Sequence, residues 1–374
     1  MGVDWRAVRA EFPALERWTF LNTATYGQMP RRAVEAAARH YAHRDELACS
    51  DFLSWFDDAD RIRGLIAQLI HSAPEDIAFI PNAATALGLL LGGLDWQPGD
   101  RIVTLQDEFP NNLYHPALLA ARGVEVVEAP WSEFYPSVTS RTRLVVLSEV
   151  NYTTGFRPPL QEISEFLHER DVLLYVDGTQ SLGALQFDVR RLRPDMLAVH
   201  GYKWMLAPNG AGFMYVAPAL RERLHPSVVG WRSHRDWRRV DNLHHGAPEF
   251  KSDAEKYEGG MLPFPLLYPM GASVEMFLEI GPALIEQRVI DLTTLVREAL
   301  RRLGARLLAD EGPHYNSPVV AARVQGADAS ELARQLKQRR VLVSARHGLL
   351  RLSAHFYNNE EDIERFEAEL QPLL

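Results

Sequence analysis

Short apolar runs alternate with amphipathic stretches between about residues 75 and 216, and this alternation limits the folds that the chain can adopt. The runs are rich in β-branched and aromatic residues, as strands are, whereas the stretches between them, such as 111–121 and 160–170, have helical spacing. Strands that alternate with helices form a parallel sheet, and strands that are apolar on both sides need helices on both faces of that sheet. We therefore predict an α/β fold with strands at 77–81, 101–106, 124–129, 144–150, 173–177, 196–200 and 212–216.

The remaining segments predict a second, smaller domain. A helix is expected at 31–46, and a loop rich in glycine and proline follows residue 216. A long helix over 267–304, bent at Gly281 and Pro282, leads to a β-α-β-β-α pattern near the C-terminus. A single core seldom grows beyond about 250–300 residues. In this chain of 374 residues we expect a large α/β domain with the N-terminal segment at 1–255, and a small α+β domain at 256–374.

Charge and cysteine content exclude several classes of protein. The 40 basic and 49 acidic residues give a net charge of −9, which is the wrong sign for a protein that holds nucleic acid. The single cysteine, Cys49, allows no internal disulfide and no thiolate metal cluster. No apolar run approaches the roughly 18 residues of a membrane span. We expect a cytoplasmic protein without a membrane or nucleic acid partner.

A loop with three histidines is a weak candidate for a metal site. His234, His244 and His245 lie close together in the sequence, but no other type of metal ligand accompanies them. We expect solvated or hydrogen-bonded histidines there, and no metal.

An acid and a lysine stand at the ends of two neighbouring predicted strands. Asp177 ends the strand 173–177, where open α/β sheets place their ligand crevice, and Lys203 follows the strand 196–200. A partly desolvated lysine forms imines, and a carboxylate can keep a pyridine nitrogen protonated. The pair suits pyridoxal phosphate (PLP), a cofactor that withdraws electrons through its ring. The alternative is a buried ion pair that stabilises the sheet.

A phosphate site is expected at the first strand of the same sheet. The segment IPNAATALG predicts a strand to Pro81, a turn at Asn82 and a helix from about Ala83. Backbone N–H groups at a helix N-terminus bind anions, and the Thr85 hydroxyl adds a donor.

Seven segments together resemble the class-V aminotransferase group, which includes cysteine desulfurases, kynureninases, isopenicillin N epimerase and the sulfoxide lyase of ergothioneine synthesis. They are FLNTATYGQMP, PNAATALG, DEFPNN, SEVNYTTG, VDGTQSLG, HGYKWMLAPNGAGF and RLSAHFYNNEEDI, in the order of the family. The resemblance spans nearly the whole chain. It implies the fold type I of PLP-dependent transferases, with a mostly parallel seven-stranded sheet in the large domain.

The resemblance also implies roles for individual residues around PLP. Lys203 would form the internal aldimine and Asp177 would bind the pyridine nitrogen. Phe109, where desulfurases usually have a histidine, would stack on the ring. The ring oxygen and the phosphate would be held by Gln180, Asn151, Ala83, Ala84, Thr85, His200 and Tyr202.

Substrate and subunit contacts are implied in the same way. Arg351 would bind the substrate carboxylate and Asn22 would lie beside the substrate, whereas Arg346 has a supporting role and a surface position as alternatives. In this family a neighbouring subunit completes the site, and the segments GWRSH and YEGGMLPF match the contributors. Trp231 would then donate its indole N–H to the phosphate. A homodimer with a shared active site is expected.

The cysteine count separates the members of the family. Desulfurases need a thiol in the C-terminal half to accept sulfur, and no cysteine lies between residues 50 and 374. We therefore predict a PLP enzyme that acts on a small L-amino acid, proceeds through an external aldimine and a quinonoid, and lacks a persulfide cysteine. A lyase that eliminates across a C–S bond is favoured. An aminotransferase, an epimerase, a kynureninase-type enzyme and a non-catalytic binding subunit are the alternatives.

Overall fold

The computed structural model of the chain describes residues 2–243 and 246–374. His244 and His245, and the prediction made for them, lie outside these residues. His234 accepts a hydrogen bond at Nδ1 from the backbone N–H of Asp236, 3.0 Å away.

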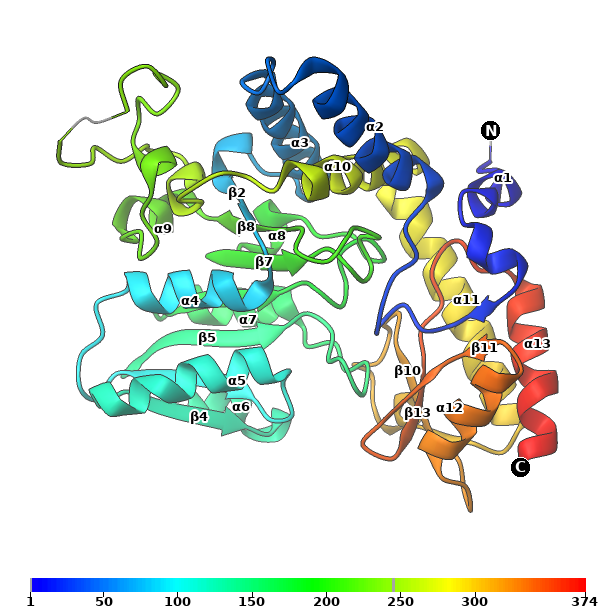
Figure 1. Cartoon of the computed structure of the whole chain (residues 1–374). Helices are drawn as coiled ribbons and strands as arrows, with labels where there is room; N and C mark the ends of the chain where they lie inside the picture. The colour runs from blue at the N-terminus through cyan, green and yellow to red at the C-terminus, as the bar shows by residue number, and fades with distance from the viewer. Residues whose placement is uncertain (1, 244–245) are drawn as a thin grey trace.

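A seven-stranded sheet forms the larger part of the molecule, in the order β2-β8-β7-β6-β5-β3-β4 (Figure 1). Its strands are β2 Ile77–Ile80, β3 Arg101–Leu105, β4 Glu125–Ala129, β5 Thr142–Ser148, β6 Leu173–Asp177, β7 Met196–His200 and β8 Gly212–Val216. The predicted strands are confirmed, and their ends differ by no more than two residues. The strands β3 to β7 run parallel, but β8 is antiparallel to both β2 and β7. The composition of an apolar run does not show whether the strand runs parallel or antiparallel to its neighbours. A wholly parallel sheet would therefore be a wrong prediction at β8.

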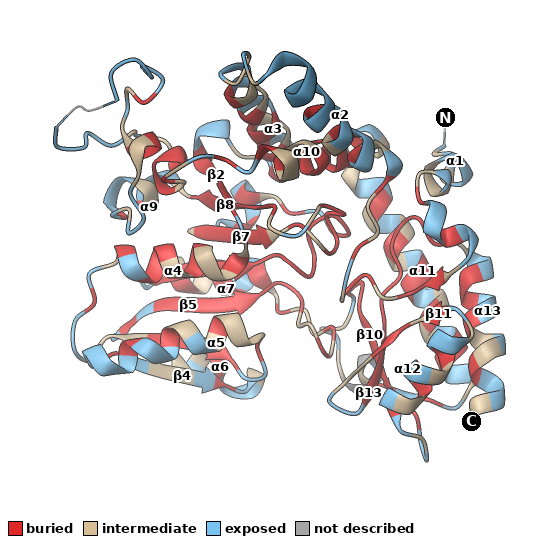
Figure 2. Ribbon diagram, viewed as in Figure 1, coloured by how far each residue is buried: buried red, intermediate tan, exposed pale blue. Residues whose placement is uncertain are grey.

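Helices cover both faces of this sheet. Alternate strand residues enter two separate hydrophobic clusters, because successive side chains of a strand point to opposite faces. Ala78 and Ile80 pack with α4, whereas Ile77 and Phe79 belong to the cluster that includes residues of α3, α7 and α10. Figure 2 shows β2, β5, β7 and β8 as buried strands between helices, whereas the edge strand β4 is partly exposed. The prediction that every strand is covered on both faces is therefore wrong at β4.

The helices are α1 Trp5–Ala10, α2 Arg31–Leu47, α3 Ser54–Ile70, α4 Ala83–Gly93, α5 Pro110–Ala117, α6 Phe134–Ser137, α7 Leu160–His168, α8 Val189–Leu192, α9 Pro218–Arg223, α10 Phe264–Ile280, α11 Pro282–Arg302, α12 Ala329–Gln338 and α13 Glu360–Leu370. The predicted bend of the long helix is confirmed: α10 and α11 meet at Gly281, whose φ is +97°. Sequence analysis missed α3.

A four-stranded sheet, in the order β12-β13-β10-β9, lies against α11, α12 and α13 on the other side of the molecule (Figure 1). Its strands are β9 Arg306–Leu307, β10 Val320–Arg323, β12 Ser344–Arg346 and β13 Leu349–Leu352. The N-terminal strand β1, Thr19–Phe20, pairs in parallel with β11, Val341–Leu342. The helix α10 packs on α2 and α3, although it follows residue 255. Both ends of the chain thus contribute to the smaller part, and the domain division at residue 255 stays a prediction.

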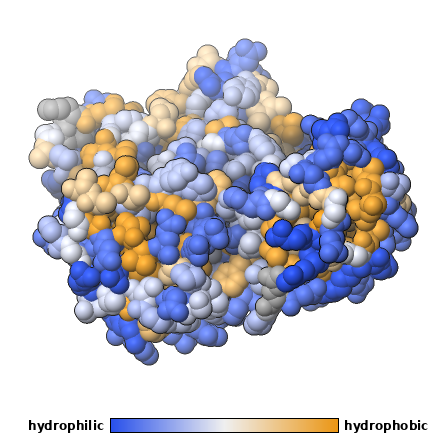
Figure 3. All heavy atoms as spheres, turned by 90° about the horizontal axis from the view of Figure 1, so that it is seen from below, coloured by the Kyte–Doolittle hydropathy of each residue, from blue (hydrophilic) through white to orange (hydrophobic). Residues whose placement is uncertain are grey.

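On the face shown in Figure 3, hydrophobic residues form separate patches with hydrophilic residues between them. Among the residues that the structure describes, no helix is both long and apolar enough to cross a bilayer.

Candidate active site

A pocket lies at the carboxyl ends of β5, β6 and β7, at the N-terminus of α4 and at the start of α5. We call it the cofactor pocket. It is lined by Ala83, Phe109, Asn111, Ser148, Tyr152, Asp177, Thr179, Gln180, His200, Tyr202 and Lys203. The structure therefore brings together seven of the residues that sequence analysis assigned to the cofactor.

Lys203 is buried in this pocket, where its side chain forms no ion pair with a carboxylate of the described residues. Burial lowers the pKa of its ammonium from 10.5 to about 8, and the positive charges of Arg351 and Arg346 act in the same direction. Nζ lies 5.4 Å from the centroid of the Phe109 ring and 5.3 Å from that of Tyr202. The amine is thus available near neutral pH to bond with an aldehyde.

Asp177 ends β6 and is also buried. Its Oδ1 accepts a hydrogen bond from the backbone N–H of Thr179 at 2.8 Å, and burial raises the pKa of the carboxyl. No ion pair within 4 Å joins Asp177 to Lys203, although the Asp177 charge raises the pKa of Lys203 against the effect of burial. The two groups instead line one space from neighbouring strands.

Gln180 and His200 are held by backbone and side-chain contacts. Gln180 donates from Nε2 to the carbonyl of Ala24 at 3.0 Å and accepts at Oε1 from the Trp204 indole at 3.0 Å. A second amide N–H of Gln180 remains for a ligand. Burial lowers the pKa of His200 to about 4, and its Nε2 accepts from the backbone N–H of Gly210 at 3.3 Å. The His200 ring is therefore neutral.

The N-terminus of α4 opens at the same pocket. Asn82 caps the helix by accepting the backbone N–H of Thr85 at 2.9 Å, which leaves other first-turn N–H groups for a ligand. Ala83 lines the pocket, and Ala84 and Thr85 follow it in the first turn. This arrangement suits an anionic group such as a phosphate.

Arg351, on β13, faces this region from the smaller part of the molecule. Its residue is 1% exposed, and burial lowers its pKa to about 9. It donates from Nη2 to the Thr25 hydroxyl at 2.6 Å and from Nη1 to the Tyr152 carbonyl. No carboxylate of the described residues forms an ion pair with it. Asn22 lies nearby, in an isolated bridge with Ser353, the residue directly after β13, and its buried Oδ1 has no partner among the described residues.

Two predicted residues lie elsewhere in this single chain. The Asn151 side chain donates to the Asp107 carbonyl in the loop after β3 at 2.9 Å, and accepts from the backbone N–H of Thr154 in its own loop at 3.0 Å. Trp231 packs against Phe56 and Trp237, outside the cofactor pocket. Their predicted contacts with PLP stay predictions.

Sequence analysis missed several residues of the site. Ser148, Tyr152 and Thr179 line the cofactor pocket, and Thr25 binds Arg351. All four belong to segments already quoted for the resemblance. Their polar side chains at the ends of predicted strands, or in the turn-rich N-terminal segment, were the available signal.

The residues present fit PLP. A buried carboxylate and a buried lysine line one space, Phe109 provides an aromatic face beside Nζ, and a helix N-terminus opens at the same pocket. The described residues contain no group of three or more His, Cys, Asp or Glu side chains that could hold a metal ion.

Comparisons with known proteins agree with this geometry. The family model of Aminotransferase class-V matches residues 19–366. The chain is 29% identical to an isopenicillin N epimerase of Streptomyces clavuligerus, over 99% of this chain and 98% of that protein. It is 24% identical to a probable cysteine desulfurase of Methanothermobacter thermautotrophicus, over 96% of this chain and 95% of that one.

Solved structures share the fold. One is the cystine C–S lyase C-DES with its reaction product cysteine persulfide, at a TM-score of 0.88 and 24% identity, over 96% of this chain and 99% of that one. A variant of C-DES with glycine covalently linked to PLP gives a TM-score of 0.90 at 24% identity, over 97% and 98% of the two chains.

Proposed function

The chain belongs to the Aminotransferase class-V family of PLP-dependent enzymes, and from this premise we propose that it eliminates across the C–S bond of a small L-amino acid. With one water consumed, the products would be a thiol, pyruvate and ammonia. No protein thiol would receive the sulfur.

The observation that carries this proposal is the position of the single cysteine. Cys49 follows α2, in the connection to α3, and it is not among the residues that line the cofactor pocket. It is only partly buried. A persulfide relay needs a nucleophilic thiol within reach of the substrate sulfur. The solved C–S lyase with this fold supports the remaining route, in which sulfur leaves with the product.

The protein residues have separate tasks in this reaction. Bound PLP supplies the electron sink that makes the substrate Cα–H acidic. Lys203 is placed to hold this cofactor and then to take the proton from Cα at Nζ, since its lowered pKa keeps part of the amine neutral. Asp177 would hold the pyridine nitrogen of this cofactor, and Phe109 would cover its ring. Arg351 orients the substrate carboxylate with its planar guanidinium.

The proposal is tested by incubating the enzyme with L-cysteine and S-methyl-L-cysteine and measuring pyruvate, ammonia and the released hydrogen sulfide or methanethiol. All three should form in equal amounts, and Lys203→Ala should form none. Absence of pyruvate with both compounds would show that the reaction is not this elimination.

Epimerisation is a second candidate, because the chain is 29% identical to an isopenicillin N epimerase over 99% of its length. The same Lys203 amine could return the proton to the opposite face of Cα. In deuterated water, epimerisation gives the D-amino acid labelled at Cα without loss of sulfur, and chiral chromatography separates this outcome from elimination.

We also propose that the active enzyme is a homodimer. Val228, Val229 and Met261 are about half exposed or more, at 49%, 51% and 62%. They lie on two segments that pair through the hydrogen bond from the backbone N–H of Arg232 to the carbonyl of Gly259, at 3.0 Å. Exposed apolar side chains gathered in this way favour burial against a second copy. Trp231 lies on the first of these segments.

A further inference from the structure

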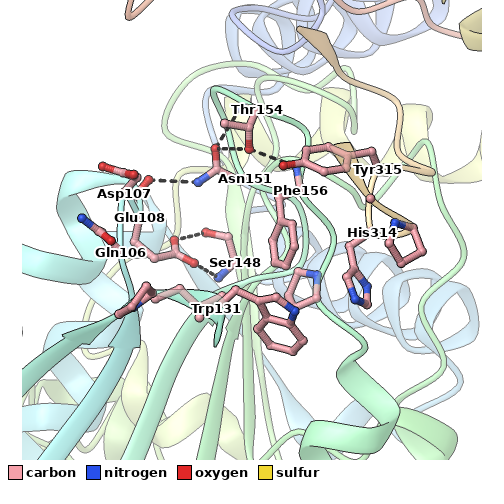
Figure 4. Close-up of a pocket in the computed structure, with 15 residues that line it drawn as sticks. Gln106, Asp107, Glu108, Trp131, Ser148, Asn151, Thr154, Phe156, His314 and Tyr315 are labelled. Atoms are coloured by element: carbon pink, nitrogen blue, oxygen red, sulfur yellow. Dashed lines mark hydrogen bonds between the residues drawn. The ribbon is translucent and has the colours of Figure 1, made fainter. Parts of the chain in front are cut away.

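A second cavity, of about 500 Å³, lies beside the cofactor pocket at the carboxyl ends of β3 and β5. We call it the aromatic pocket. Figure 4 shows it between the loops that follow these strands and the segment 312–315 of the smaller part. It is lined by Leu105, Gln106, Asp107, Glu108, Pro130, Trp131, Ser148, Asn151, Thr154, Phe156, Pro158, Gly312, Pro313, His314 and Tyr315. Its volume is in the range of sites that bind small organic molecules.

Four aromatic rings form one wall of this pocket. The Trp131 ring lies 5.5 Å from Phe156 and 5.3 Å from His314, between centroids. Phe156 in turn lies 5.4 Å from His314 and 5.8 Å from Tyr315. The contacts are tilted or edge-to-face, so the rings do not stack on one another. Such a wall favours contact with the face or edge of another planar ring.

Two polar side chains of the opposite wall, those of Glu108 and Asn151, already have hydrogen-bond partners within the protein. The Glu108 carboxylate accepts from the backbone N–H and the hydroxyl of Ser148, at 2.7 and 2.6 Å, and from the Asn112 amide at 3.0 Å. The side-chain oxygen Oδ1 of Asn151 accepts hydrogen bonds from the backbone N–H groups of Thr153 and Thr154. These groups offer few hydrogen bonds to a ligand, which favours an apolar occupant.

The aromatic pocket and the cofactor pocket share a wall. Ser148 lines both cavities. Glu108 lines the first and its neighbour Phe109 the second, and the same alternation holds for Asn151 and Tyr152. The aromatic pocket is therefore the cavity next to the place where a substrate held at Lys203 would lie.

We propose that the aromatic pocket receives the distal group of the amino-acid substrate, and that this group is a planar aromatic ring. The inference rests on the proposed function, because it requires an amino acid bound at Lys203 and Arg351. It adds the substrate class: an aromatic thioether of cysteine.

The test compares two amino acids that the enzyme cannot eliminate, because a CH₂ group replaces sulfur. One is L-norvaline and the other is L-norvaline with a phenyl group on its terminal carbon. Isothermal titration calorimetry of the PLP-loaded enzyme measures both dissociation constants. We expect the phenyl compound to bind about ten-fold more tightly or better, as an aromatic contact in a pocket does.

Two variants locate the preference. Trp131→Ala and His314→Ala should each remove most of it, while L-norvaline binds as before. Tyr114→Ala is the matched control, since this tyrosine is 71% exposed and lines neither pocket. If Trp131→Ala does not fold, His314→Ala still tests the pocket, because His314 lies in a partly exposed segment.

The outcomes separate the two proposals. Equal binding of both compounds, or a preference that survives in both variants, would overturn the aromatic pocket and leave the proposed function standing. If neither compound bound, the amino-acid site itself would be wrong, and the pocket assignment would fail with it.

Discussion

Lys203 shows how a single buried side chain acquires its chemistry. An ammonium without a carboxylate partner is costly to bury, so the folded protein favours the neutral amine. The pKa falls from 10.5 to about 8, with burial as the largest cause. An ordinary surface lysine would hold almost no neutral amine at pH 8.

This shift predicts the pH dependence of cofactor uptake. Only the neutral amine attacks the PLP aldehyde, and a lowered pKa means that this form gains as pH rises through about 8. The rate at which cofactor-free protein takes up PLP should therefore increase through pH 8 and then level off. Stopped-flow absorbance at a series of pH values measures it. A rate that levels off only above pH 10 would contradict the shift.

The burial of Arg351 predicts that this single residue affects substrate binding. Its buried guanidinium has no carboxylate partner among the described residues, so its charge is free for a substrate. A hydrogen bond to a charged group is worth about 1.5–3 kcal/mol, so Arg351→Ala should raise KM roughly 10- to 100-fold. Steady-state kinetics measure the change, with the exposed Arg170→Ala as control. An unchanged KM would place the substrate carboxylate elsewhere.

Site residues were predictable where they stand at or just after the end of an apolar strand. Asp177 and Lys203 follow apolar strands, so their place at one sheet edge came from the pattern, and their cofactor followed from chemistry. Thr25, Tyr152 and Arg351 come from three distant segments and meet through the hydrogen bonds of the guanidinium. Their meeting depends on how the smaller part packs on the sheet, which no local pattern contains.

Among the elements, the loop after β7 is positioned by a close backbone contact. Gly183 has φ +102°, and a methyl group there would overlap the carbonyl of Trp204, the residue next to Lys203. Gly183→Ala should destabilise the protein by about 3 kcal/mol or more and reduce PLP occupancy. Gly99→Ala is the matched control: its φ is +93°, but nothing lies within 4 Å, so only about 1 kcal/mol is expected. Urea unfolding and absorbance measure both. Equal effects would refute the close contact.

The elements differ in how well the sequence specifies them. The strands were predictable because a strand covered on both faces is apolar throughout and is bounded by turns. The direction of β8 was not, since parallel and antiparallel strands in a covered sheet have the same composition. The pairing of β1 with β11 joins residues 19–20 to 341–342, and two-residue strands leave no pattern.

The whole molecule places the two pockets between its two sheets. Arg351 and the segment 312–315 reach the site from the smaller part, whereas Lys203, Asp177 and Trp131 belong to the larger one. Any change in how the parts pack would therefore alter both the carboxylate contact and the aromatic wall. The two subunits of the proposed homodimer are predicted to meet at the segments around Trp231 and Gly259.

Mixing two defective variants tests whether the active site is shared between the subunits. If Trp231 completes the site of the partner subunit, a heterodimer of Lys203→Ala with Trp231→Ala has one intact site. Random exchange of equal amounts should then restore about a quarter of the wild-type sites. The assay uses a PLP concentration that saturates the wild type but not Trp231→Ala, and each variant mixed with itself is the control. If Trp231 acted within its own chain, every site in the mixture would keep one defect and no activity would return.

The size of the particle in solution gives an independent test of the dimer. Light scattering should give a particle of twice the chain mass of 42.3 kDa, and a monomer would contradict the shared site.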